Sequence, residues 1–133
     1  ELRVKSLELE NVVFLGYKSG DELKDEVKKS MFVVLPSEWY ENNPRAIIEG
    51  FALGKPAIGA RIGGIPELVK DHETGLTFEP WNADDLKRKI SQLIENPFEI
   101  SRMGKNARKM VNEELNPEIH YKKLMEIYEQ ITG

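Results

Sequence analysis

Residues 31–69 carry the pattern that decides the fold: MFVVLPSEWYENNPRAIIEGFALGKPAIGARIGGIPELV. The stretch begins with a short apolar run, Met31 to Leu35, which is typical of a buried strand in a parallel sheet. Asn43 and Pro44 are favourable at the N-cap and at the first position of a helix, so a helix is expected to begin there. Pro56 to Ala60 predicts another strand. A strand, a helix and a strand in this order predict a right-handed crossover within a parallel sheet.

The sequence before this stretch predicts one more strand and one more helix. Asn11 to Gly16 is a short, β-branched run that ends in glycine, as expected of a buried parallel strand. Ser19 and Glu22 form a capping box, so a helix is expected from there to about Ser30. Residues 1–10 are expected to form only a lead-in.

The sequence after it predicts one strand and then helices. Pro66 begins another turn of helix, and Leu76 to Phe78 predicts a fourth strand. From Asn82 onward the apolar residues follow a helical period, and new helices are expected after Pro97 and Pro117.

This alternation predicts one α/β domain with a Rossmann-like parallel sheet in residues 11–80 and C-terminal helices in residues 81–133. Ligands of such sheets bind beyond the carboxyl ends of the strands. The loops that matter for function are therefore expected at Tyr17 to Gly20, Ser37 to Pro44, and Arg61 to Pro66.

Composition excludes several kinds of chemistry. The 133 residues include no cysteine, which excludes disulfides, thiolate zinc sites and cysteine nucleophiles. The net charge of −4 comes from interspersed acids and bases without a basic block, so nucleic acid is not an expected partner. No apolar run approaches the roughly 20 residues that cross a bilayer. His72 and His120 stand apart from acids at ligand spacing, so neither a metal site nor a catalytic histidine is expected.

Acids and amides crowd the loop that precedes the helix in residues 31–69. Glu41 lies just before that helix, where the dipole favours a carboxylate, and Glu49 lies two turns later on the same side. Both could point into one cleft. The amide groups of Asn43, Arg45 and Ala46 would attract a phosphate or a polar sugar group. The structural alternative is that the two glutamates are a dipole-favoured surface acid and a solvated helix residue.

Two other features of these loops have both a functional and a structural interpretation. Gly63 and Gly64 permit positive φ and allow the backbone to approach a ligand or another domain closely, but a plain tight turn also uses glycine. Trp39 and Tyr40 are expected either to cover the mouth of the cleft or to pack under the loop.

The string from Ser37 to Val69 resembles the signature region of glycosyltransferase family 4. That family carries two glutamates separated by seven residues, then Gly-x-Pro at the start of a strand, then Gly-Gly-x-x-Glu. The chain has all three in order, at Glu41 and Glu49, at Gly54 to Pro56, and at Gly63 to Glu67. The resemblance extends from about Asn11 to the C-terminus and includes residues 71–78 and 103–108.

This resemblance implies the nucleotide-sugar-binding domain of a GT-B-fold glycosyltransferase that uses a UDP-, GDP- or ADP-sugar, retains anomeric configuration and requires no cofactor or metal. By resemblance, Glu41 would contact the hydroxyls of the transferred sugar, and Glu49 would hydrogen-bond the ribose. The remaining contacts implied for the donor are those of Asn42, Asn43, Pro44 and Arg45 with the sugar and pyrophosphate, and those of the backbone near Gly16 and Tyr17 with the base.

The chain departs from the family on its N-terminal side. Family members have two further strand-helix units before the strand at Val12, with an Arg and a Lys that hold the pyrophosphate, and an N-terminal acceptor-binding domain; none of these is visible in the sequence. The usual order of a doubly wound sheet would place those strands between Val12 and the strand at Phe32. The strand at Val12 is therefore expected to pair directly with the next strand or with another chain, as a homodimer.

The leading hypothesis is transfer of a sugar from a nucleotide sugar to a glycan or polysaccharide acceptor, in the cytoplasm, with little activity for the chain alone. A non-catalytic nucleotide- or phosphate-binding module is the first alternative. The others are an epimerase or phosphorylase on the same fold, and an assembly domain without a ligand.

Overall fold

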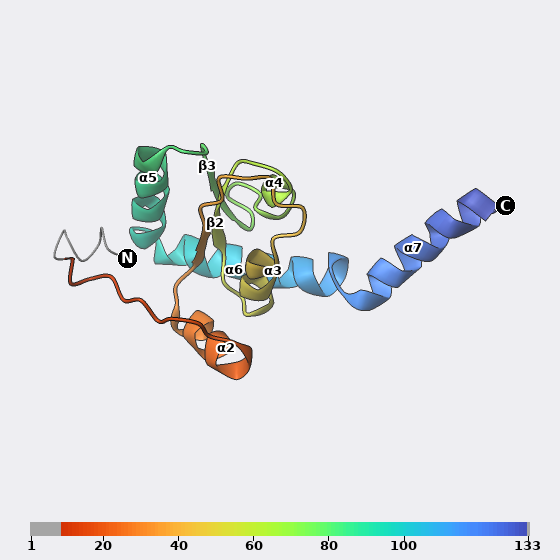
Figure 1. Cartoon of the computed structure of the whole chain (residues 1–133), viewed down its shortest axis with the longest axis horizontal. Coiled ribbons are helices and arrows are strands. Elements are labelled where there is room, and N and C mark those ends of the chain that lie inside the picture. The colour runs from red at the N-terminus through yellow and green to blue at the C-terminus, as the bar shows by residue number, and fades with distance from the viewer. Residues whose placement is uncertain (1–8, 133) are drawn as a thin grey trace.

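A parallel sheet of three strands, flanked by helices, forms the centre of the computed structural model, which describes residues 9–132 (Figure 1). The expected lead-in at residues 1–10 lies almost entirely outside these residues. The elements are α2 (Gly20–Lys29), β1 (Val33–Leu35), α3 (Arg45–Ala52), β2 (Ala57–Ala60), α4 (Ile65–Leu68), β3 (Gly75–Phe78), α5 (Ala83–Ile94), α6 (Pro97–Glu114) and α7 (Pro117–Thr132).

The strands lie in the order β1-β2-β3, and each pairs in parallel with the next strand along the chain. Val34 lies opposite Ile58, which lies opposite Leu76 in turn. Gly75 is required at the start of β3, because a Cβ there would collide with the carbonyl of Ala57. Three of the four expected strands, and the expected α/β class with a Rossmann-like parallel sheet, are confirmed.

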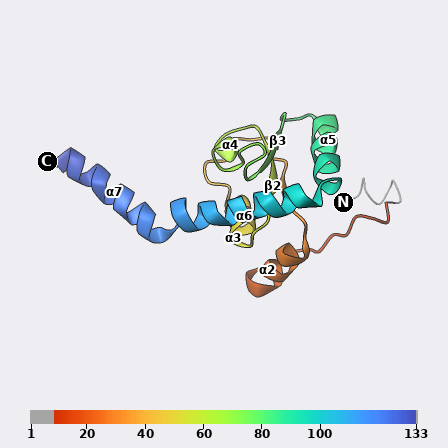
Figure 2. The same cartoon turned by 180° about the vertical axis from the view of Figure 1, so that it is seen from behind.

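The core fills the space between the sheet and its helices. Its largest fully buried apolar side chains are Ile47, Phe51, Ile58, Ile65, Leu76, Leu93, Met103 and Val69. Figure 2 shows α6 running across α3 and β2. Gly104 permits this crossing, because a Cβ there would collide with the carbonyl of Gly54. Helix α7 leads away from the sheet and continues the path of α6 outward (Figures 1 and 2).

The prediction of a strand from Asn11 to Gly16 is wrong. These residues form no strand, and all of them are exposed, with Val13 at 75%. Within residues 9–132, β1 pairs with β2 alone, so the expected direct pairing with this segment is not formed. The physical reason is that an apolar run becomes a strand only when its backbone groups have a partner, and the usual order separates these two strands. Pairing with another chain stays a prediction.

Two expected helix starts differ in detail from the structure. Ser19 is the N-cap of α2, but its side chain makes no capping hydrogen bond, and Glu22 instead lies 3.8 Å from the ammonium of Lys18. The capping box is therefore wrong, although the helix is confirmed. Helix α3 has Pro44 rather than Asn43 at its N-cap, because the carbonyl of Pro44 already accepts the first helical bond, from the amide of Ile47 at 3.0 Å.

Candidate functional site

The candidate site lies where two loops meet at the carboxyl ends of β1 and β2. The amide of Gly64 donates to the carbonyl of Glu41 at 2.7 Å, which joins the loop after β2 to the loop after β1. Gly63 has a φ of 58°, and a Cβ there would lie only 2.7 Å from the amide nitrogen of Glu41 and 2.8 Å from its carbonyl oxygen. The positive φ is therefore confirmed at Gly63 but not at Gly64, whose φ is −80°, and the expected close approach to a ligand or another domain stays a prediction. The segment that is approached belongs to this chain.

Glu41 is half-buried, and one of its carboxylate oxygens is held in place. Its Oε1 accepts hydrogen bonds from Ser37 Oγ at 3.2 Å and from Trp39 Nε1 at 3.0 Å. Ser37 is buried, whereas Trp39 is 66% exposed. Oε2 accepts no hydrogen bond from residues 9–132, so it can accept one from a ligand hydroxyl. The carboxylate is thus oriented on one side and free on the other.

Trp39 and Ser37 are the site residues whose roles sequence reasoning missed. Trp39 packs under no loop, since its indole is exposed and donates to Glu41. The signal in the sequence was spacing. Ser37 lies four residues and Trp39 two residues before Glu41, so both side chains can reach its carboxylate within one turn.

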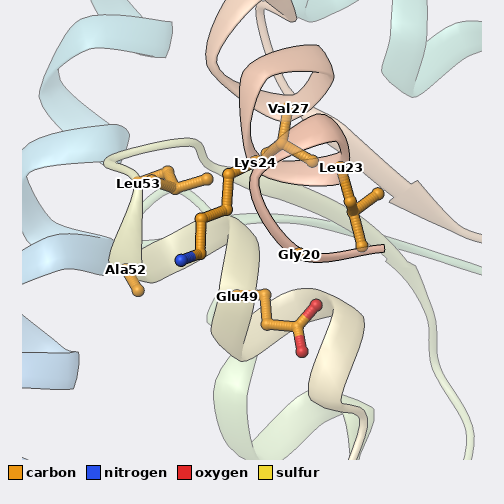
Figure 3. Close-up of a pocket in the computed structure, with 7 residues that line it drawn as sticks. All are labelled: Gly20, Leu23, Lys24, Val27, Glu49, Ala52 and Leu53. Carbon is orange, nitrogen blue, oxygen red and sulfur yellow. The ribbon is translucent and has the colours of Figure 1, made fainter. Parts of the chain in front are cut away.

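Glu49 lines a cavity of about 260 Å³ between α2 and α3 (Figure 3). The carboxylate extends from α3, while Leu23 and Lys24 extend from α2 toward the same space. Glu49 is exposed and lies 3.7 Å from the guanidinium of Arg45, one turn earlier. Glu41 does not line this cavity, so the expected common cleft for the two glutamates stays a prediction. The complete lining consists of Gly20, Leu23, Lys24, Val27, Glu49, Ala52 and Leu53.

The start of α3 is open to solvent. Within residues 9–132, the amides of Arg45 and Ala46 donate to no backbone carbonyl, and Pro44 provides no side-chain cap. Asn43 and Arg45 are exposed, as is Asn42. Two free amides at the positive end of a helix, beside an exposed guanidinium, form a surface that attracts an anion such as a phosphate.

Gly16 and Tyr17 lie on the exposed segment before α2 and do not line the Glu49 cavity. Gly16 has a φ of 68°, and Tyr17 is 92% exposed. Gly20, four residues after Gly16, does line the cavity. The start of α2 therefore lines the same cavity as Glu49, whereas the backbone at Gly16 and Tyr17, which was expected to bind the base, does not.

A second polar cluster lies at the carboxyl end of β3. Asp85 accepts hydrogen bonds from the guanidinium of Arg88 at 2.5 Å and from the amide of Glu79 at 2.8 Å. These donors hold the pKa of Asp85 below its usual range, with Arg88 the larger influence. Asn82 caps the same helix, because its Oδ1 accepts from the amide of Asp85 at 2.9 Å.

Neither a metal centre nor a membrane span emerges from the part of the chain that the structure describes. Residues 9–132 contain no group of three or more His, Asp or Glu placed to hold a metal ion. In the same range, every helix is too short or too polar to cross a bilayer.

Relatives in sequence are glycosyltransferases. The chain is 39% identical over 100 residues to an uncharacterized glycosyltransferase of Methanocaldococcus jannaschii, a match that covers 75% of this chain and 28% of that protein. It is 33% identical over 129 residues to the N-acetyl-alpha-D-glucosaminyl L-malate synthase of Bacillus anthracis, covering 96% of this chain and 32% of that protein. The chain thus spans about a third or less of the length of these relatives.

Solved structures share the fold. Sucrose-phosphate synthase from Thermosynechococcus elongatus matches with a TM-score of 0.86 and 29% identity, over 98% of this chain and 33% of that chain. HepE from Anabaena, solved in complex with UDP-glucose, matches with a TM-score of 0.85 and 25% identity, over 97% of this chain and 35% of that chain.

The family model of glycosyl transferases group 1 matches residues 1–110. This range contains both glutamates, the start of α3 and the Gly63–Gly64 loop. Because the match covers most of the chain and the neighbours share its α/β fold, the chain belongs to the glycosyl transferases group 1 family.

Proposed function

We propose that this chain binds the donor of a retaining glycosyltransferase, which transfers a sugar from a nucleotide-diphosphate sugar to an acceptor such as a glycan. The observation that carries the proposal is the open start of α3, with free amides at Arg45 and Ala46 and with Glu41 and Glu49 on the flanking loop and helix. The complex of HepE with UDP-glucose, on a fold that matches 97% of this chain, supports a nucleotide sugar as the ligand.

Glu49 anchors the nucleotide in this proposal. A carboxylate accepts hydrogen bonds from two neighbouring hydroxyls, which is the arrangement that a ribose offers. Arg45 lies 3.7 Å from Glu49 and is exposed enough to turn toward a phosphate. The backbone at Gly16 and Tyr17 lies along the edge of the base, and Asn42, Asn43 and Pro44 lie along the sugar and the pyrophosphate.

Glu41 acts on the transferred sugar. Ser37 and Trp39 hold Oε1, so Oε2 is presented in a fixed direction to a sugar hydroxyl. A fixed negative charge near the anomeric carbon also stabilises the positive charge that develops there as the bond to the nucleotide breaks. A preoriented carboxylate needs little reorganisation at that moment, which is how such a group lowers a barrier.

The acceptor is proposed to bind outside the stretch that this chain shares with its relatives, because that stretch is only about a third of their length. Activity of the chain alone is accordingly expected to be low. The cytoplasm is the proposed location, since nucleotide sugars mostly occur there.

Calorimetric titration with UDP, GDP, ADP and their glucose or mannose conjugates tests the proposal. Glu49→Ala is expected to weaken binding by about 1 to 3 kcal/mol, as for loss of a charged hydrogen bond. Glu113→Ala is the matched control, because Glu113 is also an exposed helical glutamate paired four residues away, with Lys109 at 3.9 Å. The proposal fails if no nucleotide binds or if the two variants weaken binding equally. Binding without sugar transfer, measured in a protein that also supplies an acceptor-binding domain, would favour the non-catalytic module.

A further inference from the structure

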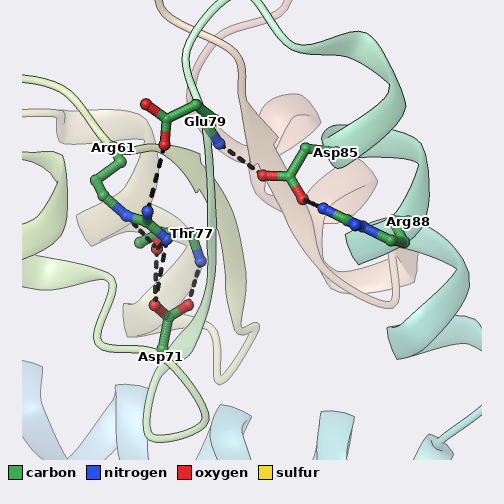
Figure 4. Close-up of polar contacts among 6 residues, drawn as sticks. All are labelled: Arg61, Asp71, Thr77, Glu79, Asp85 and Arg88. Carbon is green, nitrogen blue, oxygen red and sulfur yellow. Dashed lines mark hydrogen bonds and ion pairs between the residues drawn. The ribbon is translucent and has the colours of Figure 1, made fainter.

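Arg61 follows β2 directly, and its side chain turns back onto β3 (Figure 4). Its Nη2 and Nε donate to Thr77 Oγ1 at 3.0 and 3.3 Å, and its Nη1 donates to Glu79 Oε2 at 3.3 Å. A carboxylate oxygen of Asp71 lies 3.8 Å from Nη2. The planar guanidinium thus uses several of its fixed donors on one small surface, an arrangement that lysine cannot reproduce.

Thr77 is itself held so that it can accept from Arg61. It is buried, its amide donates to Asp71 Oδ1 at 2.6 Å, and its hydroxyl donates to Asp71 Oδ2 at 2.8 Å. Because the hydroxyl has one hydrogen and gives it to Asp71, its lone pairs remain for Arg61. Arg61 is therefore tied to a buried side chain that is itself held by Asp71, in addition to the exposed Glu79.

The same loop that begins at Arg61 ends on Glu41. The amide of Arg61 donates to the carbonyl of Phe78 at 2.9 Å, and three residues later the amide of Gly64 donates to the carbonyl of Glu41 at 2.7 Å. Between them Gly63 has positive φ and touches the backbone of Glu41. Only Ile62 and Gly63 lie between the two bonds, so the path from Arg61 to the backbone of Glu41 is short.

We propose that Arg61 is a positioning residue that fixes the loop at 61–64 on β3 and thereby sets Glu41 against the donor sugar. The role given to Glu41 rests on the proposed function, whereas the coupling of Arg61 to Glu41 does not. The competing role for Arg61 is direct contact with a donor phosphate. Its donors already point at Thr77 and Glu79, which favours positioning.

The first test measures the coupling without any ligand. Amide hydrogen exchange is followed by NMR in the wild-type chain, in Arg61→Ala and in Arg61→Lys. The Gly64 amide is expected to exchange at least about threefold faster in Arg61→Ala, relative to amides of β2, with a smaller change in Arg61→Lys. Lys109→Ala removes a comparable exposed ion pair within α6 and should leave Gly64 unchanged. Unchanged exchange at Gly64 in Arg61→Ala overturns the proposal.

The second test measures what the coupling does for the sugar. The readout is the ratio of the dissociation constants for UDP and UDP-glucose, which reports the contribution of the sugar alone. Arg61→Ala is expected to reduce this ratio about 3- to 10-fold, and adding it to Glu41→Ala should cause no further loss. Equal weakening of UDP and UDP-glucose, or additive effects of the two substitutions, would overturn positioning in favour of phosphate contact. If the wild-type chain binds neither, the same ratio is measured with the GDP and ADP pairs. If it binds none of the three nucleotides or their conjugates, the proposed function fails and the exchange result still decides the coupling.

Discussion

Replacing Gly63 with alanine probes how tightly the loop at 61–64 is held against Glu41. Alanine at a φ of 58° costs about 1 to 2 kcal/mol, because the left-handed region brings Cβ close to the following carbonyl. The new Cβ would also lie 2.7 Å from the Glu41 amide nitrogen, so the loops must separate by about 0.7 Å to restore ordinary contact. That separation weakens the Gly64 to Glu41 hydrogen bond, which contributes about 1 kcal/mol. The expected total loss of unfolding free energy is about 2 to 3 kcal/mol.

Urea unfolding measures this loss, and Gly54→Ala provides the control. Gly54 has a φ of 71°, but the nearest atom to its Cβ would be at 3.9 Å, so only the conformational cost of about 1 to 2 kcal/mol applies. Gly63→Ala should also reduce the affinity for a nucleotide sugar more than Gly54→Ala does. Equal effects of the two substitutions on both stability and affinity would refute the inference that the loop presses on Glu41.

Three further predictions concern the core, the acid response and the exposed N-terminal segment. Met103→Ala should lower the unfolding free energy by about 2 to 5 kcal/mol in urea titrations, because Met103 is fully buried and α6 cannot collapse into the cavity; a loss below about 1 kcal/mol would contradict its place in the core. Asp85 has a pKa below its ordinary value, so its stabilising contribution is present above that ordinary value and is lost as pH falls through the folded-state pKa. Asp85→Asn should therefore lower the urea midpoint at pH 7, and this effect should shrink as pH falls below the ordinary pKa of an aspartate; a pH-independent effect would count against this origin. Val13→Ser should change stability by less than about 0.5 kcal/mol, since Val13 is exposed, and a larger change together with a dimeric sedimentation mass would show that residues 11–16 pair with another chain.

An apolar run predicted a strand correctly only where a neighbouring strand was available for pairing. The runs that became β1, β2 and β3 are continuous and short, and each pairs with the next along the chain. Residues 11–16 carry the same pattern but form no strand. An apolar run indicates that a segment can be buried, but it does not indicate whether a neighbouring strand is available for pairing.

For the candidate site, local features were easier to predict from the sequence than contacts between distant residues. Exposed amides at the start of α3 were expected from local sequence, but with Asn43 at the N-cap; the structure places Pro44 there, and Pro44 offers no capping side chain. The sequence indicated that the backbone at Gly63 could approach another group closely, but it did not identify Glu41 as that group. The bonds of Arg61 with Thr77 and Glu79 span 16 and 18 residues, and their formation depends on the register of β2 and β3, which local patterns do not contain.

The order of the strands has a consequence for synthesis on the ribosome. All three strands are available once Phe78 has emerged, yet Met103, Ala107 and Met110, the last buried residues of the core, emerge about 25 to 32 residues later. At usual elongation rates of about 5 to 20 residues per second, a nascent sheet would wait about 2 to 6 s with that part of its apolar surface uncovered. During that interval the growing chain is most exposed to aggregation and to capture by chaperones.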